Sequence, residues 1–288
     1  LPRFLFLIDA MVFGKVASMS RCRRPRNQNI IRFQNNPSRA FLFLQSYRRL
    51  YQGVAHSRTV LQPHQVQQHN HVDPTHPTHG HRGRRQRPHV TLVFIGKRNL
   101  DAAIADIHQG QPDANIVVRW RPFFLRPNMP KEGTAKDPAT PPERRAPQRL
   151  KDAGSKVGID FTGKTDRYPN STLMHALMLY TLENDGPAVQ HMLADVTFRH
   201  YFSDGKYANA TNLRDAAVEA GVAKPDAAIL YAQDTANQAR VVAEAADYSR
   251  KGVSGVPFFV VNGTPAGSGA MPPSTFKSLI EEQLLAKT

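Results

Sequence analysis

The sequence predicts an α/β core that is interrupted by an all-helical insertion. Three observations lead to this prediction. A short β-rich run, Ile116–Trp120, follows a segment with helical spacing, and four further helical segments fill residues 171–250. An aromatic and β-branched run then ends at Asn262-Gly263, the strongest hairpin signal in the chain. The 288 residues, 40% of them hydrophobic, suffice for one large domain or two small ones.

The first part of the predicted core is one helix and one strand. Residues 99–107 have apolar side chains at helical spacing, with Asp101 in the first turn, and Ile116–Trp120 has the composition of a strand. Three prolines then exclude regular structure, namely Pro122, Pro127 and Pro130. Residues 131–147 are polar and proline-rich, which predicts a loop.

Helical spacing dominates the next part of the chain. Pro187 suits a first-turn position after Gly186, and Gly221 suits a C-terminal cap. The predicted helices are 171–184, 187–203, 209–220 and 226–250. After the hairpin signal, Thr275–Ala286 predicts a final amphipathic helix.

The net charge of +15 belongs to one segment. Residues 1–90 contain 15 Lys and Arg against two acids, Asp9 and Asp73, whereas the rest of the chain is nearly neutral. Residues 1–90 show no sustained periodicity, and we expect them to be disordered. Three interpretations stay open: an organellar transit sequence, a nucleic-acid-binding tail, or misassigned coding sequence. Because the basic excess is confined to this segment, we do not expect nucleic acid to be the partner of the core.

Composition excludes several classes of protein. The single cysteine, Cys22, cannot form an intramolecular disulfide, a CxxC pair or a cysteine-rich zinc site. No apolar run is long enough to span a bilayer, so we expect no membrane partner. The irregularly spaced histidines from His71 to His81 predict no metal site, and no residue pattern predicts a cofactor.

Four stretches resemble the DsbA-like thioredoxin-fold oxidoreductases, especially their FrnE-type branch. They are Phe94-Ile-Gly-Lys-Arg-Asn-Leu-Asp-Ala-Ala-Ile104, Trp120-Arg-Pro-Phe-Phe-Leu125 with Pro127-Asn-Met-Pro130, Pro169-Asn-Ser-Thr with His175, and Gly252-Val-Ser-Gly-Val-Pro-Phe-Phe-Val260 with Ser268-Gly-Ala270. The resemblance implies a thioredoxin-like core over residues 91–130 and 236–288. The helical insertion would then span residues 145–235.

The resemblance also implies where substrate would bind. In this family the Val-Pro peptide of the GVP motif is usually cis and presents backbone to substrate, which assigns Val256 and Pro257 to the substrate-binding site. Asn170 and His175 would face the same cleft, where the histidine could titrate near neutral pH. The alternative for Asn170 is a helix cap, and for His175 a partly buried helix face. Trp120, Phe123 and three methionines at helical spacing (Met174, Met178 and Met192) are assigned to the core.

The sequence departs from the family at the catalytic motif. A CxxC pair would immediately precede the Phe94-Ile-Gly-Lys97 stretch, but Val90-Thr-Leu-Val93 stands there. Valine cannot form the thiolate that attacks a disulfide, and Cys22 lies in a segment without resemblance. We therefore predict no catalytic residue and no thiol–disulfide exchange by this chain.

The strand that should precede the CxxC motif is also missing from the pattern. In a thioredoxin-like sheet that strand is central, but Arg82–Pro88 is charged and ends in proline. The simplest hypothesis is that residues 1 to about 92 replace an absent first exon. The rival hypothesis is a degenerate family member whose N-terminal segment supplies a substitute strand, which we place at His89–Ile95.

Three functions remain for the core. The family function is thiol–disulfide exchange with protein or peptide substrates. A kappa-type glutathione-dependent isomerase or transferase is the second, although it would have to rely on Thr91 because no serine lies between His89 and Phe94. A non-catalytic module that binds extended peptides is the third. The resemblance further implies a cytoplasmic protein, and no pattern predicts the oligomeric state.

Overall fold

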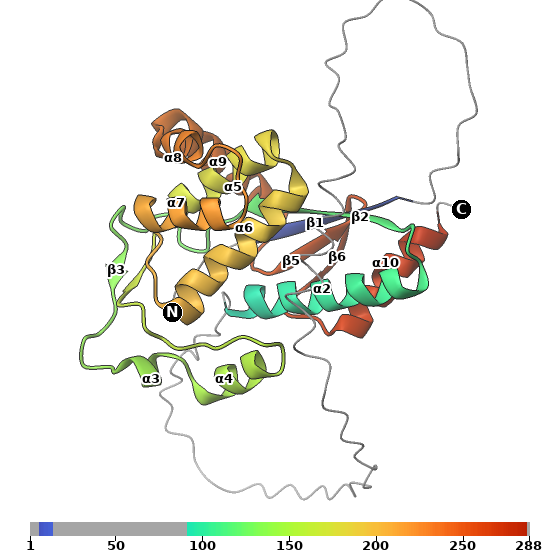
Figure 1. Ribbon diagram of the computed structural model, residues 1–288, viewed down its shortest axis with the longest axis horizontal. Coiled ribbons are helices and arrows are strands. Elements are labelled where there is room, and N and C mark those ends of the chain that lie inside the picture. The colour runs from blue at the N-terminus through green and yellow to red at the C-terminus, as the bar shows by residue number, and fades with distance from the viewer. Residues whose placement is uncertain (1–5, 14–90, 287–288) are drawn as a thin grey trace, which may run out of the picture. The chain divides into compact units, whose positions relative to one another are not determined.

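The computed structural model describes residues 6–13 and 91–286, which form a four-stranded mixed sheet with flanking helices (Figure 1). The strand order is β2–β1–β5–β6. The strands are β1 (Phe6–Phe13), β2 (Asn115–Pro122), β5 (Phe258–Val261) and β6 (Thr264–Ser268). Helix α2 (Thr91–Gly110) packs against helix α10 (Pro273–Leu285), and Figure 1 shows the two side by side. The predicted α/β core is confirmed.

Helix α2 forms because its apolar residues repeat with the period of a helix. Val93, Leu100, Ala103 and Ile107 lie on one face, and each is at most 1% exposed. The predicted helix over residues 99–107 is therefore confirmed and extends to Thr91. The substitute strand at His89–Ile95 is wrong, because Thr91–Ile95 form the first turns of helix α2; His89 lies outside the described residues.

The central position of the sheet is nevertheless filled from the N-terminal segment. Strand β1 pairs antiparallel with β2, from Phe6 opposite Pro122 to Phe13 opposite Asn115, and parallel with β5. A strand leading directly into α2 would be the first strand of a β-α-β unit and would therefore run parallel to β2. Strand β1 thus occupies the expected position in the opposite direction. It also corrects the prediction of disorder over residues 1–90 at this one place; the rest of that segment lies outside the described residues.

The hairpin of β5 and β6 follows from its two turn residues. Asn262 and Gly263 have φ angles of 51° and 82°. Both lie in the left-handed region that a two-residue type I′ turn requires. The sequence prediction of a hairpin here is confirmed, and the turn brings Phe259 opposite Gly267.

The helical block between the two halves of the core agrees with the prediction except at one break. Helices α5 (Thr172–Asn184), α6 (Pro187–Arg199) and α7 (Ala210–Glu219) are present, and a π-helical turn, His200–Asp204, extends α6. The single helix expected over residues 226–250 is two, α8 (Pro225–Gln233) and α9 (Thr235–Arg250). Asp234 separates them because its extended backbone and its side chain, which accepts the Asn237 N–H at 3.0 Å, cap α9.

The segment between β2 and α5 contains short elements that periodicity did not predict. A two-residue strand β3 (Thr134–Ala135) pairs with β4 (Arg167–Tyr168), and between them lie α3 (Pro142–Arg145) and α4 (Gln148–Ser155). The predicted loop over residues 131–147 therefore includes β3 and α3. Elements this short bury too few side chains to leave a period in the sequence.

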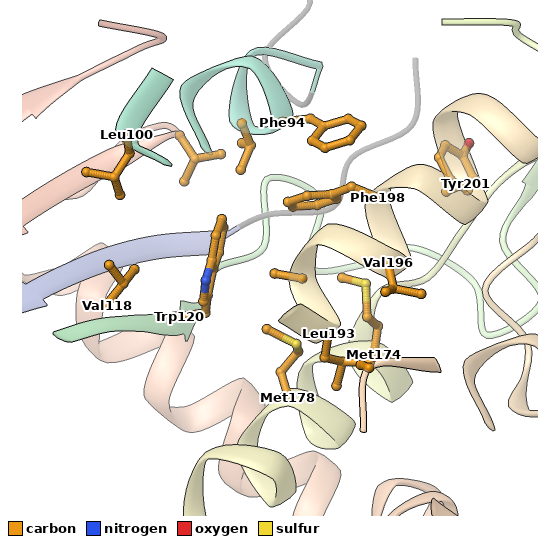
Figure 2. Close-up of a cluster of buried hydrophobic side chains, with 14 of the residues drawn as sticks. Phe94, Leu100, Val118, Trp120, Met174, Met178, Leu193, Val196, Phe198 and Tyr201 are labelled. Carbon is orange, nitrogen blue, oxygen red and sulfur yellow. The ribbon is translucent and has the colours of Figure 1, made fainter. Parts of the chain in front are cut away.

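The core joins the sheet to the helical block (Figure 2). The ring centroids of Phe94 and Phe198 are 5.4 Å apart, and those of Trp120 and Phe198 are 5.7 Å apart. The sequence assignments of Trp120, Phe123, Met174 and Met178 to the core are confirmed, because each is at most 3% exposed, whereas Met192 is partly buried against it. One continuous apolar cluster thus fixes α2, β2 and α6 together.

Candidate functional site

The first turn of α2 is where the sequence resemblance would place a catalytic CxxC pair. The helix begins with Thr91-Leu92-Val93, and Val93 is fully buried; Val90 lies outside the described residues. A nucleophile at this position would gain from the positive end of the helix dipole. The described turn offers one hydroxyl, that of Thr91, which is 4% exposed, and no sulfur.

The GVP motif packs directly on this helix. The Val256–Pro257 peptide is cis, which confirms the expectation for this bond. The ring of Pro257 meets Gly96 so closely that a Cβ on Gly96 would lie 3.3 Å from Pro257 Cγ. The Pro257 carbonyl accepts the Gly269 N–H at 2.8 Å, which fixes the loop to the end of β6. Glycine at position 96 therefore allows the proline loop to lie against α2.

The residues before the proline leave their backbone groups open. Ser254 is exposed and Gly255 is half-buried. Within the part of the chain that the structure describes, Ser254, Gly255 and Val256 form no backbone hydrogen bond. Backbone donors and acceptors are nearly always paired, with protein or with solvent. Val256 is buried, but Ser254 and Gly255 leave unpaired backbone groups accessible beside the sheet, where an extended peptide could pair with them.

Asn170 holds two segments of the protein together. Its amide nitrogen donates to the Met129 carbonyl at 2.8 Å, and its Oδ1 accepts the Thr172 N–H at 2.9 Å. The second bond supports the first turn of α5, but the N-cap residue of this helix is Ser171, whose side chain makes no capping bond, so Asn170 acts from the position before the cap. Both ends of the Asn170 amide are engaged within the fold, and its contacts go to the loop after β2 rather than to Pro257.

His175 lies in the interior of the protein. It is 1% exposed, and its ring packs edge-to-face on Phe124 at a centroid distance of 5.0 Å. Burial lowers the pKa of His175 to about 3, although a hydrogen bond with the Phe123 backbone acts in the opposite direction. The ring therefore stays neutral near pH 7, and the expectation that it titrates there is wrong.

A buried charged cluster adjoins the site, and the sequence analysis did not predict it. The Lys97 Nζ lies 2.7 Å from Asp101 Oδ2 and 3.1 Å from Asp195 Oδ1, and Arg98 also pairs with Asp195 at 3.2 Å. Burial alone would raise the pKa of Asp101, but Lys97 and His191 outweigh it and hold this pKa well below its usual range. The spacing of Lys97 and Asp101, four residues apart on one helix, was the available signal.

His191 and Trp120 continue this cluster into the helical block. The Trp120 indole N–H donates to His191 Nδ1 at 3.0 Å, so the His191 proton lies on Nε2, which donates to Asp101 Oδ1 at 2.7 Å. Burial and the nearby Lys97 lower the pKa of His191, more than Asp101 raises it. The cluster, which contains two cations and two carboxylates, therefore ties α2, β2 and α6 together through hydrogen bonds.

The described residues set limits on other chemistries. No three His, Cys, Asp or Glu side chains in residues 91–286 are grouped so that they could hold a metal ion. Among those same residues, no helix is long and apolar enough to cross a membrane. Cys22 and the histidines from His71 to His81 lie outside the described part of the chain.

The sheet order, the helical block and the cis-proline loop against α2 define a thioredoxin-like protein of the class with a helical insertion. The model of the DSBA-like thioredoxin domain family matches residues 93–281. The chain therefore belongs to the DSBA-like thioredoxin domain family.

Among solved structures, the fold is similar to that of a probable DsbA oxidoreductase from Streptomyces coelicolor. The TM-score is 0.53 at 20% sequence identity, and the match covers 69% of this chain and 86% of that chain. This likeness concerns the fold alone. No curated protein matches the chain.

Proposed function

We propose that this chain keeps the substrate-binding frame of a thiol–disulfide oxidoreductase and binds extended cysteine-containing peptides without exchanging their disulfides. The open backbone of Ser254–Val256 beside Pro257 is the observation that carries the proposal. Main-chain pairing at such an edge gives affinity without a reactive group. Exchange needs a thiolate, and Val90-Thr-Leu-Val93 supplies none.

The absence of exchange is tested by restoring the missing sulfurs. The variants are Val93→Cys and the double variant Val90→Cys/Val93→Cys, both in a Cys22→Ser background, and the assay is the reduction of insulin by dithiothreitol. We expect the unaltered chain and the single variant to match the rate without protein, and the double variant to exceed it. An unaltered chain that accelerates insulin reduction contradicts the proposed inactivity.

Peptide binding is tested at Gly255 with two matched variants. A Cβ at this position meets nothing within 4 Å and the φ is not left-handed, so Gly255→Ala leaves the loop intact, whereas Gly255→Pro removes the backbone N–H. The probe is a fluorescein-labelled peptide with an alkylated cysteine, followed by anisotropy. Loss of one backbone hydrogen bond should weaken binding by roughly 2- to 12-fold in Gly255→Pro only. Equal affinity of both variants would exclude this edge as the binding site.

Three finer assignments belong to the same proposal. The residues of Trp120-Arg-Pro-Phe-Phe-Leu125 and Gly252–Val260 support the FrnE-type branch and, with it, a cytoplasmic location. Val256 and Pro257 are the proposed substrate contacts. Asn170 and His175, assigned to the same site by the resemblance, would act only indirectly, because Asn170 is bonded to Met129 and Thr172 and His175 is buried against Phe124. Glutathione is a second candidate ligand because it is a small thiol peptide, and its binding to the unaltered chain, measured by calorimetry, tests this directly.

A further inference from the structure

A small hollow lies beside the N-terminal end of α2, apart from the proline loop. It has a volume of about 30 Å³, enough for about two water molecules. Its polar lining includes Thr91, Lys136 and Arg145, and its apolar walls include Phe161 and Tyr201. The two cationic residues come from the segment between β2 and α5, where the polar, proline-rich sequence predicted a loop.

Two cations in this lining have no carboxylate partner. Lys136 is 8% exposed, and its ammonium donates to the Thr165 carbonyl at 2.7 Å and to Thr165 Oγ1 at 2.6 Å. Arg145 donates to the same carbonyl at 3.1 Å and to the Thr140 carbonyl at 2.9 Å. No ion pair within 4.0 Å is formed by either residue in the described structure. Two positive groups therefore share one neutral oxygen.

This arrangement is electrostatically unusual for a buried lysine. Buried charges in proteins are normally paired. Burial and, to a smaller extent, the neighbouring Arg145 lower the pKa of Lys136 to about 8, against a weaker opposing effect of Asp166. The rings of Tyr168 and Tyr201 lie 5.4 and 5.5 Å from the ammonium and compensate part of its charge. The positive end of the 20-residue helix α2 reaches the same hollow through Thr91.

We infer that the hollow lined by Lys136 and Arg145 binds the carboxylate of a substrate, either a small organic acid or an acidic or C-terminal group of a peptide. The inference rests on the proposed function, because it names a chemical class of the ligand that the same protein would hold. A lysine ammonium has three donors, of which Thr165 uses two, and an arginine can approach a carboxylate with two parallel bonds. The volume of the hollow fits a planar carboxylate alone, so the rest of the ligand, including the ring of a probe such as benzoate, would lie outside it.

Benzoate and its neutral analogue benzamide provide the test, measured by calorimetry on the full chain at constant ionic strength. We expect saturable binding of benzoate and none of benzamide. The variant Lys136→Met should weaken benzoate binding about tenfold or more, as loss of a charge-assisted hydrogen bond requires. The matched control is Lys156→Met, an exposed lysine at the end of α4, which should leave the affinity unchanged.

Several outcomes would overturn the inference. They are equal binding of benzamide, equal weakening by both lysine variants, and tighter binding of inorganic phosphate than of benzoate. If thermal unfolding shows that Lys136→Met does not fold, Arg145→Met replaces it with the same expectation. Gly255→Pro should keep its benzoate affinity, so failure of the peptide edge and failure of the carboxylate site are separate results. A peptide that binds more tightly as the free acid than as the C-terminal amide would identify a peptide terminus as the source.

Discussion

Removal of the Lys97 charge should destabilise the whole fold. The substitution Lys97→Met keeps the length and apolar character of the side chain, but it leaves Asp101, which is 2% exposed, without its closest cation. Breaking a buried ion pair in this way costs about 3–5 kcal/mol. Asp195 is partly exposed, and His191 can take up a proton to compensate Asp101, so we expect the lower end, about 3 kcal/mol.

The single tryptophan of the chain makes this loss measurable. Trp120 is 2% exposed and donates to His191, so its fluorescence reports both unfolding and the state of the cluster. For a chain of this size, 3 kcal/mol corresponds to a decrease in Tm of roughly 6–12 °C. Urea unfolding followed at Trp120 gives the free energy directly.

An exposed lysine pair provides the control for this prediction. Lys277 contacts Asp106 at 2.7 Å, the same distance as Lys97 and Asp101, but on the surface of α10 and α2. Lys277→Met should leave the unfolding curve unchanged, because surface pairs are solvated and contribute little. The reasoning is refuted if Lys97→Met loses less than about 1 kcal/mol, or if the two variants are equally stable.

Three further predictions concern stability. Because burial lowers the pKa of His175 to about 3, unfolding takes up a proton below about pH 6.5, and stability should fall as the pH drops towards 3. His175→Gln should remove about 1.4 kcal/mol per pH unit of that slope, and an unchanged slope in urea titrations from pH 6 to 4.5 contradicts the assignment. Ala10→Pro removes a backbone donor from β1, which pairs with a strand on each side. The free energy of unfolding should fall by about 1–3 kcal/mol for each buried backbone group left unpaired. An unaltered urea midpoint would mean that β1 is not the central strand. Gly154→Ala places a Cβ 2.7 Å from the Ile159 carbonyl and should cost about 1–3 kcal/mol of unfolding free energy. Gly158→Ser is the comparison, because its side chain meets nothing nearby and any loss there reports backbone strain alone. Equal stability of the Gly154 variant and the unaltered chain would disprove the clash.

The parts of the fold that were predicted correctly have local causes. The hairpin at Asn262-Gly263 needs only a turn sequence after an aromatic and β-branched run, and the apolar face of α2 needs only helical spacing. The break between α8 and α9 was missed because the residues on both sides of Asp234 continue the helical pattern. Only the extended backbone and capping side chain of Asp234 mark the start of a new helix. Boundaries set by a single hydrogen bond leave little trace in a periodicity.

In the candidate site, too, the features with local causes were predicted and those that depend on distant residues were not. The cis proline was predicted from the resemblance of the short GVP motif to a family in which this bond is usually cis, and the lack of a CxxC pair directly before Phe94 is a property of the sequence itself. His175 was misjudged because its neutrality depends on burial against Phe124, which comes from a different segment. The Lys97 cluster was missed because Asp195 and His191 belong to a helix about 90 residues further along the chain.

The sequence by itself determined that this chain has an α/β core with a helical insertion, that its basic charge is confined to one segment, and that no CxxC pair directly precedes Phe94. These properties are fixed by composition and by short-range order. Only the tertiary structure decided that β1 fills the central position in reverse, that His175 is neutral and that Lys136 and Arg145 share one hollow without a carboxylate. Strand pairing, burial and charge compensation depend on residues distant in sequence, and so no local pattern can specify them.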